Sequence, residues 1–223
     1  MSEASRHDDL VERLAGGLSP VRRLPPPLWR ALSWLGVAAG LGLALMPMAD
    51  MPALAGRMAV PDLRFAALGA LLTAAAAAFA AFQISVPGRS LRWALLPVPP
   101  ALLWIGASGL GCLRGVVVGG TDLPDAHQME GCFAFIVGFS LPLSVLLVWM
   151  LRRACPLHPT LTAVLGGLAA SAAAAVLLLP FHPHDATATD LAGHALAVAG
   201  VVWINGLAGG RLLSRRSGTP ERT

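Results

Sequence analysis

The sequence predicts an all-α fold class: a polytopic membrane protein, a bundle of six transmembrane helices with a short cytoplasmic amphipathic helix at the N-terminus. The first observation behind this prediction is the composition. Of the 223 residues, 56% are hydrophobic and 13% are charged, and the mean hydropathy is +0.68. A soluble domain of this length is far more polar. The second observation is that charged residues divide the chain into six apolar windows.

Each window is long enough to cross a membrane, because about 20 helical residues at about 1.5 Å each span a hydrocarbon core of about 30 Å. A soluble arm over residues 1–28 precedes the membrane domain of residues 29–212, and an arginine-rich tail over residues 213–223 follows it. The predicted spans are residues 31–49, 65–86, 93–113, 131–151, 160–181 and 190–210.

The arginines predict the orientation, since all 16 basic residues are arginine. Six spans place both termini on one side of the membrane. With cytoplasmic termini, only Arg57, Arg64 and Arg114 lie outside and the other 13 arginines lie inside, as the positive-inside rule favours. We therefore expect a multi-pass protein of the inner membrane. The lack of lysine also excludes P-loop and Schiff-base chemistry.

The first span has two competing interpretations as an export signal. Ala53-Leu-Ala55 resembles a signal-peptide cleavage site, but the apolar run before it is longer than a typical signal segment and follows a long arm. Arg22-Arg23 resembles a twin-arginine signal, but the prolines at 25–27 do not fit one. We therefore retain the first span as a transmembrane helix.

Small residues and prolines shape the spans. Gly36–Gly40 and Gly206–Gly210 have the spacing that lets helix backbones approach closely in lipid. The prolines at 97–100 and Pro142 predict frayed or kinked helices. The interior of the windows contains no Asp, Glu or Arg, which argues against transport, and His194 is the nearest exception.

The arm contains a short amphipathic helix. Ser5 with Asp8 has the form of a capping box, and Ser19-Pro20 ends the pattern. A helix this short is marginal in water, so its apolar side must lie on another surface. The side chains at helical spacing are Leu10, Val11, Leu14 and Leu18.

A protein groove suits this helix better than a membrane surface, because Asp8, Asp9 and Glu12 would be repelled by an anionic leaflet. Burial of four aliphatic side chains gives a gross hydrophobic free energy of about 6 to 12 kcal/mol. Association and ordering costs of about 4 to 15 kcal/mol cancel most of it. We therefore expect Arg22 and Arg23 to add charge-assisted contacts to the partner.

Several short motifs occur along the chain: Asp9-Leu-Val-Glu-Arg-Leu14, Pro20-Val-Arg-Arg-Leu24, Asp62-Leu-Arg-Phe65, Val86-Pro-Gly-Arg-Ser90, Leu95-Leu-Pro-Val-Pro-Pro100 and Met150-Leu-Arg-Arg-Ala-Cys-Pro-Leu-His-Pro159. Together they resemble the NrsF family over essentially the whole chain. The resemblance implies a bacterial six-span inner-membrane anti-sigma factor, which is not an enzyme and makes no direct contact with nucleic acid. It implies that the arm captures an extracytoplasmic-function sigma factor and releases it under metal or oxidative stress.

Two cysteines border the longest predicted outer loop. In an oxidising compartment Cys112 and Cys132 can form a disulfide that joins the third and fourth spans, or act as redox-sensing thiols, or remain two small buried residues. The family resemblance also implies a cysteine in the last outer loop, but this chain has Phe181 and histidines there. Cys155 lies on the inner side and is expected to be inert.

Histidines suggest a metal site at the outer face. His182 and His184 supply imidazole ligands for a divalent metal, and His127 or His194 completes the set if the loops meet. The alternative is a group of solvated loop histidines. No other cofactor is expected. The competing functional class is a metal- or redox-active membrane enzyme, or a transporter, that uses these outer His and Cys residues.

Overall fold

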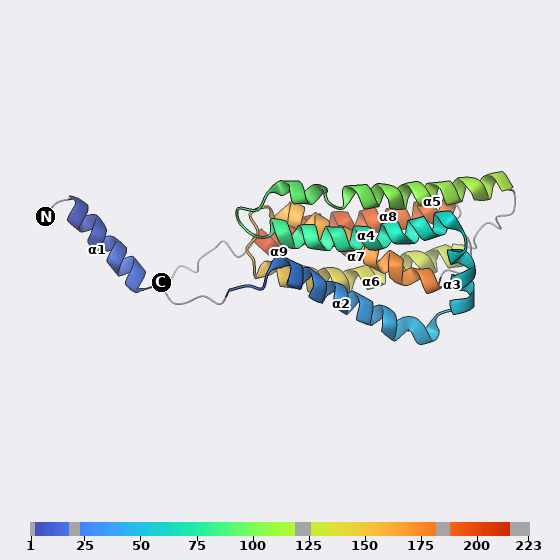
Figure 1. Cartoon of the computed structure of the whole chain (residues 1–223), viewed down its shortest axis with the longest axis horizontal. Coiled ribbons are helices and arrows are strands. Elements are labelled where there is room, and N and C mark those ends of the chain that lie inside the picture. Colours follow the sequence, from blue (N-terminus) through green and yellow to red (C-terminus); the bar gives the residue numbers. More distant parts are fainter. Residues whose placement is uncertain (1–2, 18–22, 119–125, 182–187, 215–223) are drawn as a thin grey trace.

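The computed structural model describes residues 3–17, 23–118, 126–181 and 188–214. Figure 1 shows an elongated helical bundle and one helix that stands apart from it near the N-terminus. The α-helices are α1 (Glu3–Gly16), α2 (Pro27–Leu45), α3 (Met51–Met58), α4 (Pro61–Ile84), α5 (Val98–Val118), α6 (Ala126–Arg152), α7 (Pro159–Leu178), α8 (Ala188–Ile204) and α9 (Gly210–Ser214).

Six helical segments are long and apolar enough to cross a membrane, which confirms the predicted number of spans. Three of them begin before the predicted residue, at Pro27, Pro61 and Pro159. Proline is favourable in the first helical turn, because its missing N–H would have no partner within the helix there. The segments are Pro27–Met48, Pro61–Ile84, Leu91–Leu113, Glu130–Arg152, Pro159–Phe181 and Leu191–Ser214.

The centre of the bundle is formed by α4 and α7, which pack against each other. Helix α7 also contacts α6 and α8, and α4 also contacts α2 and α5. The buried faces of both central helices are mostly alanine and glycine, so the backbones lie close together. In lipid, such close packing replaces the hydrophobic drive that holds a soluble core together.

Glycines mark the closest approaches between helices. A Cβ atom on Gly167 of α7 would lie 2.8 Å from Cβ of Asn205, and one on Gly69 of α4 would lie 2.6 Å from the backbone nitrogen of Trp104. The prediction for Gly206–Gly210 is confirmed, because this segment packs on α7. The prediction for Gly36–Gly40 is wrong: a Cβ at either glycine would meet open space.

Several short elements interrupt the long helices. The third span starts with a 3-10 helix, Leu91–Leu95, before α5, as the prolines at 97–100 predicted. Pro142 lies inside α6, which remains one continuous helix. Residues Asn205–Gly209 form a π-helix between α8 and α9. Helix α3 was not predicted from the sequence. The Asp50 side chain caps it by accepting a hydrogen bond from the backbone N–H of Ala53, 2.9 Å away.

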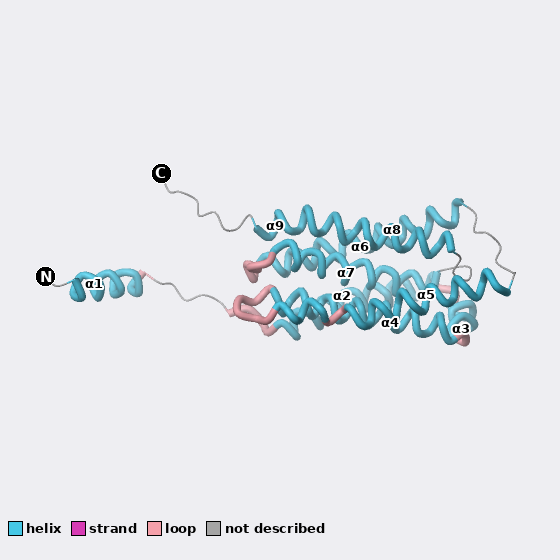
Figure 2. Tube along the Cα trace, turned by 90° about the horizontal axis from the view of Figure 1, so that it is seen from above, coloured by secondary structure: helices cyan, strands magenta, loops and turns pink. Residues whose placement is uncertain are grey.

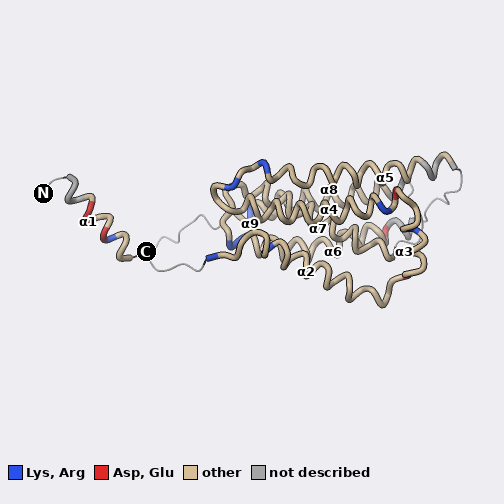
Figure 3. Tube along the Cα trace, viewed as in Figure 1, with Lys and Arg blue, Asp and Glu red and all other residues tan. Residues whose placement is uncertain are grey.

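Charge is unequally divided between the two ends of the bundle (Figure 3). We call the end where α2 begins and α6 finishes the arm end, and the end that carries α3 the far end. Figure 3 shows acidic residues of the described bundle at the far end. Arg57 on α3 and Arg64 near the start of α4 also lie at this end. The described arginines of the arm end are Arg23, Arg30, Arg89, Arg92, Arg152, Arg153 and Arg211.

Candidate functional site

Helix α1 forms the first half of the arm. It begins at Glu3, so Ser5 lies inside the helix and is not its N-cap. The predicted helix start, with Ser5 as the cap, is therefore wrong by three residues, which is nearly one turn. The helix ends at Gly16, where two consecutive glycines have low helix propensity, and so it stops before the predicted Ser19-Pro20 boundary.

The apolar stripe of α1 is uncovered. Leu10, Val11 and Leu14 are 53%, 54% and 64% exposed. Figures 1 and 2, which differ by a 90° turn, both show the helix apart from the bundle. Leu18, the fourth predicted member of the stripe, lies outside the described residues. The structure thus presents three neighbouring aliphatic side chains that the bundle does not cover.

The other side of α1 is charged. Arg13 Nη2 donates to Asp9 Oδ2 at 2.9 Å, one helical turn away, and both side chains are exposed. An exposed pair of this kind contributes only about 0.3–0.5 kcal/mol to the helix. Of the two predicted basic partner-binding residues, Arg23 is exposed and Arg22 lies outside the described residues. The role of all these arm residues in binding stays a prediction.

Arg30 fixes the point where the arm enters the bundle. Its side chain is 6% exposed, and its Nη2 donates to the carbonyl oxygen of Met150 at 2.5 Å. Because α6 ends at Arg152, this carbonyl is one of the last four of the helix, which have no partner within it. Arg30 therefore caps the C-terminus of α6, where the helix dipole favours a cation.

The same guanidinium also contacts the end of α4. Arg30 Nη1 lies 3.5 Å from Ser85 Oγ, and Cζ lies 4.6 Å from the centre of the Phe82 ring. One turn further along α2, the buried Trp34 donates through Nε1 to the carbonyl oxygen of Leu143 at 3.0 Å. The root of the arm is thus tied to both α4 and α6.

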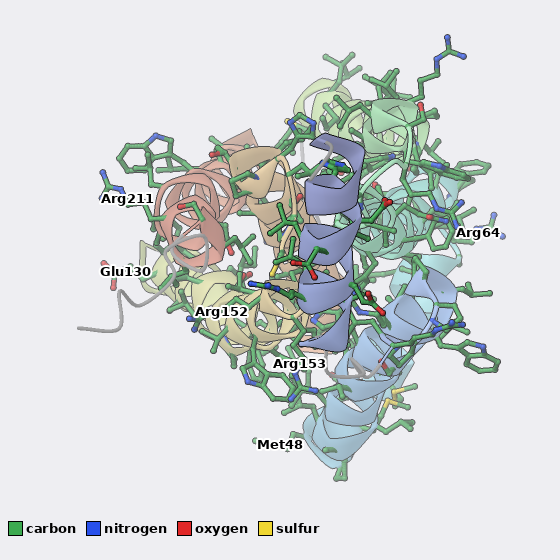
Figure 4. All side chains as sticks on the ribbon, turned by 90° about the vertical axis from the view of Figure 1, so that its left-hand side faces the viewer. Met48, Arg64, Glu130, Arg152, Arg153 and Arg211 are labelled. Carbon is green, nitrogen blue, oxygen red and sulfur yellow. The ribbon has the colours of Figure 1, made fainter. Side chains whose placement is uncertain are left out.

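Two buried polar atoms at the same end lack a hydrogen-bond partner within the described part of the chain: Gln83 Oε1 on α4 and Arg152 Nε on α6. An unsatisfied buried group costs about 1–3 kcal/mol. Figure 4 looks onto this end and shows Arg152 and Arg153 labelled beside α6. Arg153 stacks its guanidinium 4.3 Å above the Trp149 ring. The arm end therefore contains both buried polar groups that are hydrogen-bonded and buried polar atoms that are not.

The role of Arg30 was not predicted from the sequence, because this arginine precedes the first predicted span, which begins at residue 31, and was interpreted only as an orientation signal. The position of Arg30 relative to Pro27 could have indicated this role. An arginine one turn after Pro27 lies inside the helix that this proline starts, and an arginine there must find carbonyl or aromatic partners.

The predicted redox cysteines lie on different helices. Cys132, on α6, is 8% exposed and belongs to a small core cluster with Ile136 and Leu178. Cys112 is half-buried near the end of α5. Their pairing and any redox role stay predictions. Cys155 is exposed and adopts a left-handed backbone, with φ of 48°, just after α6 ends.

The predicted metal ligands are largely outside the described part of the chain. His182 and His184 lie outside it, and so does the side chain of His127. His194 is half-buried and lines a cavity at the far end. Among the residues that the structure describes, no group of three or more His, Cys, Asp or Glu residues is close enough to hold a metal ion. The metal site stays a prediction.

Comparison with known proteins identifies a family model that covers most of the chain. The family model NrsF, described as negative regulator of sigma F, matches residues 14–214. The match includes Leu14, Leu18, Arg22 and Arg23 of the predicted binding set and begins after Leu10 and Val11. No curated protein and no solved structure matches the chain.

Proposed function

The chain belongs to the NrsF family, the negative regulators of sigma F, and from this premise we propose a more specific function. The protein is a membrane-bound anti-sigma factor of the bacterial inner membrane. It sequesters an extracytoplasmic-function sigma factor through its arm and releases it when metal or oxidative stress acts at the outer face. The observation that carries this proposal is the uncovered aliphatic stripe of α1.

The stripe supports binding to a folded protein partner. Leu10, Val11 and Leu14 occupy one side of α1 and are exposed. A helix with such a stripe binds by lying in an apolar groove, with anchors at helical spacing. The other side of α1 carries acidic residues and the ion pair between Asp9 and Arg13. These charges keep the helix in water, and the acidic residues are repelled by an anionic leaflet.

The distribution of arginine supports a cytoplasmic arm. The arm end carries most of the described arginines of the bundle, and the positive-inside rule assigns such an end to the cytoplasm. The arm then lies in the compartment where a sigma factor binds RNA polymerase. The far end, with Cys132 and His194, then lies on the outer side, where a stress signal arrives.

The contacts of Arg30 support a route between the two sides. Regulation requires two states of the bundle that differ in how available the arm is. Helix α6 runs from Cys132 near the far end to Met150, which Arg30 holds at the arm end. The unsatisfied Gln83 and Arg152 mark this end as the place where another arrangement of α4 and α6 would gain hydrogen bonds.

Co-purification tests the proposed capture. The full chain is solubilised in detergent with the sigma factors of the same bacterium, and wild type is compared with Leu14→Asp and with Glu12→Asp. Each variant has Asp at an exposed α1 position, one on the stripe and one on the charged side. We expect Leu14→Asp to lose the sigma factor and Glu12→Asp to keep it. Equal retention by all three, or capture by none, would show the arm hypothesis to be wrong.

A second experiment tests the proposed input separately. A reporter gene under the sigma factor is measured in cells with Cys112→Ser, Cys132→Ser or His194→Ala, with and without an oxidant or a divalent metal. We expect normal repression without stress and a weakened response with it. A full response in all three variants would remove these side chains from the sensing site and leave the capture proposal intact.

A further inference from the structure

The loop between α4 and α5 presents two arginines at the arm end of the bundle. Arg89 and Arg92 are exposed, and neither guanidinium has a hydrogen bond or an ion pair with a residue that the structure describes. Acidic residues of the described bundle lie at the far end (Figure 3). Within the part of the bundle that the structure describes, these two cations therefore have no counter-charge.

The backbone of this loop is held by its own hydrogen bonds. The backbone N–H of Arg89 donates to the carbonyl oxygen of Val86 at 3.2 Å, across a turn in which Gly88 has a φ of 80°. The backbone N–H of Arg92 donates to Ser90 Oγ, also at 3.2 Å. Both arginines are thus presented from an ordered turn, so little backbone freedom is lost when they bind an anionic group.

Helix α1 carries a matching pair of carboxylates. Asp8 and Glu12 are exposed and lie four residues apart, so they share one flank of the helix. Like charges at this spacing destabilise a helix. Asp9 lies on the next flank and pairs with Arg13 at 2.9 Å. Asp8 and Glu12 have no such ion pair within the described residues, and a cationic surface against their flank would relieve their repulsion.

The tether between α1 and α2 is long enough to bring the two pairs together. Arg30, one turn into α2, has Nη1 3.5 Å from Oγ of Ser85, where the loop starts. Arg89 follows Ser85 by four residues, which extend to at most about 14 Å. The tether, residues 17–26, is more than twice as long as this part of the loop. The loop therefore lies within reach of α1.

We propose that α1 docks on the α4–α5 loop, with Asp8 and Glu12 against Arg89 and Arg92. A guanidinium pairs with a carboxylate through charge-assisted hydrogen bonds. Exposed pairs are weak, but the tether makes their formation intramolecular, so the helix exchanges between this docked arrangement and the free one of Figure 1. A lipid phosphate offers these arginines one anion, whereas α1 offers two at a fixed spacing.

Docking also affects how available the arm is, a consequence that rests on the proposed function. Val11 is three residues from Asp8, so it borders the flank that meets the loop. The docked helix therefore turns part of its aliphatic stripe toward the bundle. The free helix is the arrangement that captures a partner, and the docked helix is the one that does not.

Zero-length coupling tests the docking, because the chain contains no lysine. Arg89→Lys combined with Arg92→Lys keeps the charge of the loop and introduces two amines. The full chain, without a sigma factor, is placed in phosphatidylcholine nanodiscs and treated with a carbodiimide, which joins an amine to a carboxylate in contact with it. Mass spectrometry of the monomer band identifies the coupled peptides. We expect coupling from positions 89 and 92 to Asp8 or Glu12, and several-fold less to Asp9, which is already paired.

A matched variant and two added conditions refine the test. Arg153→Lys combined with Arg211→Lys introduces two amines at exposed positions of the same end, and should couple to α1 several-fold less. For the loop variant, the yield should fall at least about twofold between 0.1 M and 1 M salt, because the Debye length shortens from about 10 Å to about 3 Å. A saturating sigma factor should lower the yield too, and an unchanged yield would show that docking and capture do not compete.

Any of three results would overturn the docking itself. The first is that the loop does not couple to α1. The second is equal coupling in the matched variant, which would mean a general attraction to the arm end. The third is loss of coupling when phosphatidylglycerol is added to the nanodiscs, which would assign the arginines to anionic head groups. Since these measurements contain no sigma factor, they leave the proposed capture untouched, and a failed co-purification would leave the docking untouched.

Discussion

Helix α1 exposes its large aliphatic side chains, whereas α7 buries residues that are mostly alanine and glycine. The side chains with the most hydrophobic free energy to gain are thus the ones that the bundle leaves uncovered. In α7 the gain comes from close backbone approach, which lipid does not oppose. The central helices therefore cover their small side chains with one another, while the aliphatic stripe of α1 stays uncovered.

The largest expected effect concerns the close packing of α7. In Gly167→Leu the new Cβ would lie 2.8 Å from Cβ of Asn205 and 3.0 Å from Cα of Val202, a backbone atom that cannot yield easily. We expect the bundle to lose about 3 kcal/mol or more of stability. Gly36→Leu is the control, since its Cβ would meet open space. Thermal unfolding in detergent, followed by circular dichroism, measures the difference. Equal midpoints for the two variants would contradict the close-packing argument.

The second largest expected effect concerns the contacts of Arg30, which hold the start of α2 against α6 and α4. Arg30→Met removes the hydrogen bond to Met150 and the contact with Phe82 while keeping an apolar side chain of similar length. We expect a loss of about 2 kcal/mol, because the end of α6 loses its cap. Arg23→Met, an exposed arginine of the arm, should leave the unfolding midpoint unchanged. A midpoint of Arg30→Met equal to that of wild type would show that the arm root is not held through this side chain.

A smaller effect distinguishes exposed valines in the two regions. Val11 and Val37 are 54% and 51% exposed. If a partner groove covers α1, Val11→Ala removes about 1–1.5 kcal/mol of binding free energy, a change of about five- to tenfold in sigma-factor affinity. Val37→Ala, on α2, should not change the affinity. Titration of the sigma factor against both variants measures this, and equal affinities would place the interface elsewhere.

The smallest effect concerns the ion pair of α1. Arg13→Ala removes the exposed contact with Asp9. Such pairs contribute about 0.3–0.5 kcal/mol, so the affinity for the sigma factor should change by less than about twofold. A much larger change in the same titration would mean that Arg13 contacts the partner directly. The charged side of α1 would then belong to the interface.

The sequence predicted the number and approximate bounds of the spans because long apolar runs between charges leave few alternatives. It missed α3, although Asp50 and Pro52 form a recognisable helix start. It also assigned packing to Gly36–Gly40 without evidence of which side of α2 faces its neighbours. Glycine spacing alone does not give that direction.

The candidate site was predictable in part. The exposed stripe of α1 followed from the spacing of Leu10, Val11 and Leu14, because a helical period is a local property of the chain. The cap that Arg30 provides for α6 was not predictable from spacing, since the two residues that meet are 120 positions apart. The far-end cavity is lined by residues of five helices, so only their three-dimensional arrangement reveals it.

The covalent link between α1 and α2 limits how far a captured partner can travel. Residues 17–26 separate Gly16 from Pro27, and a chain of this length extends at most about 35 Å. A sigma factor captured on α1, as proposed, would therefore be confined to a thin layer beside the membrane. There it would meet the loops of the arm end at an effective concentration of roughly millimolar. Even a weak second contact with Arg89 or Arg92 would then lengthen its residence.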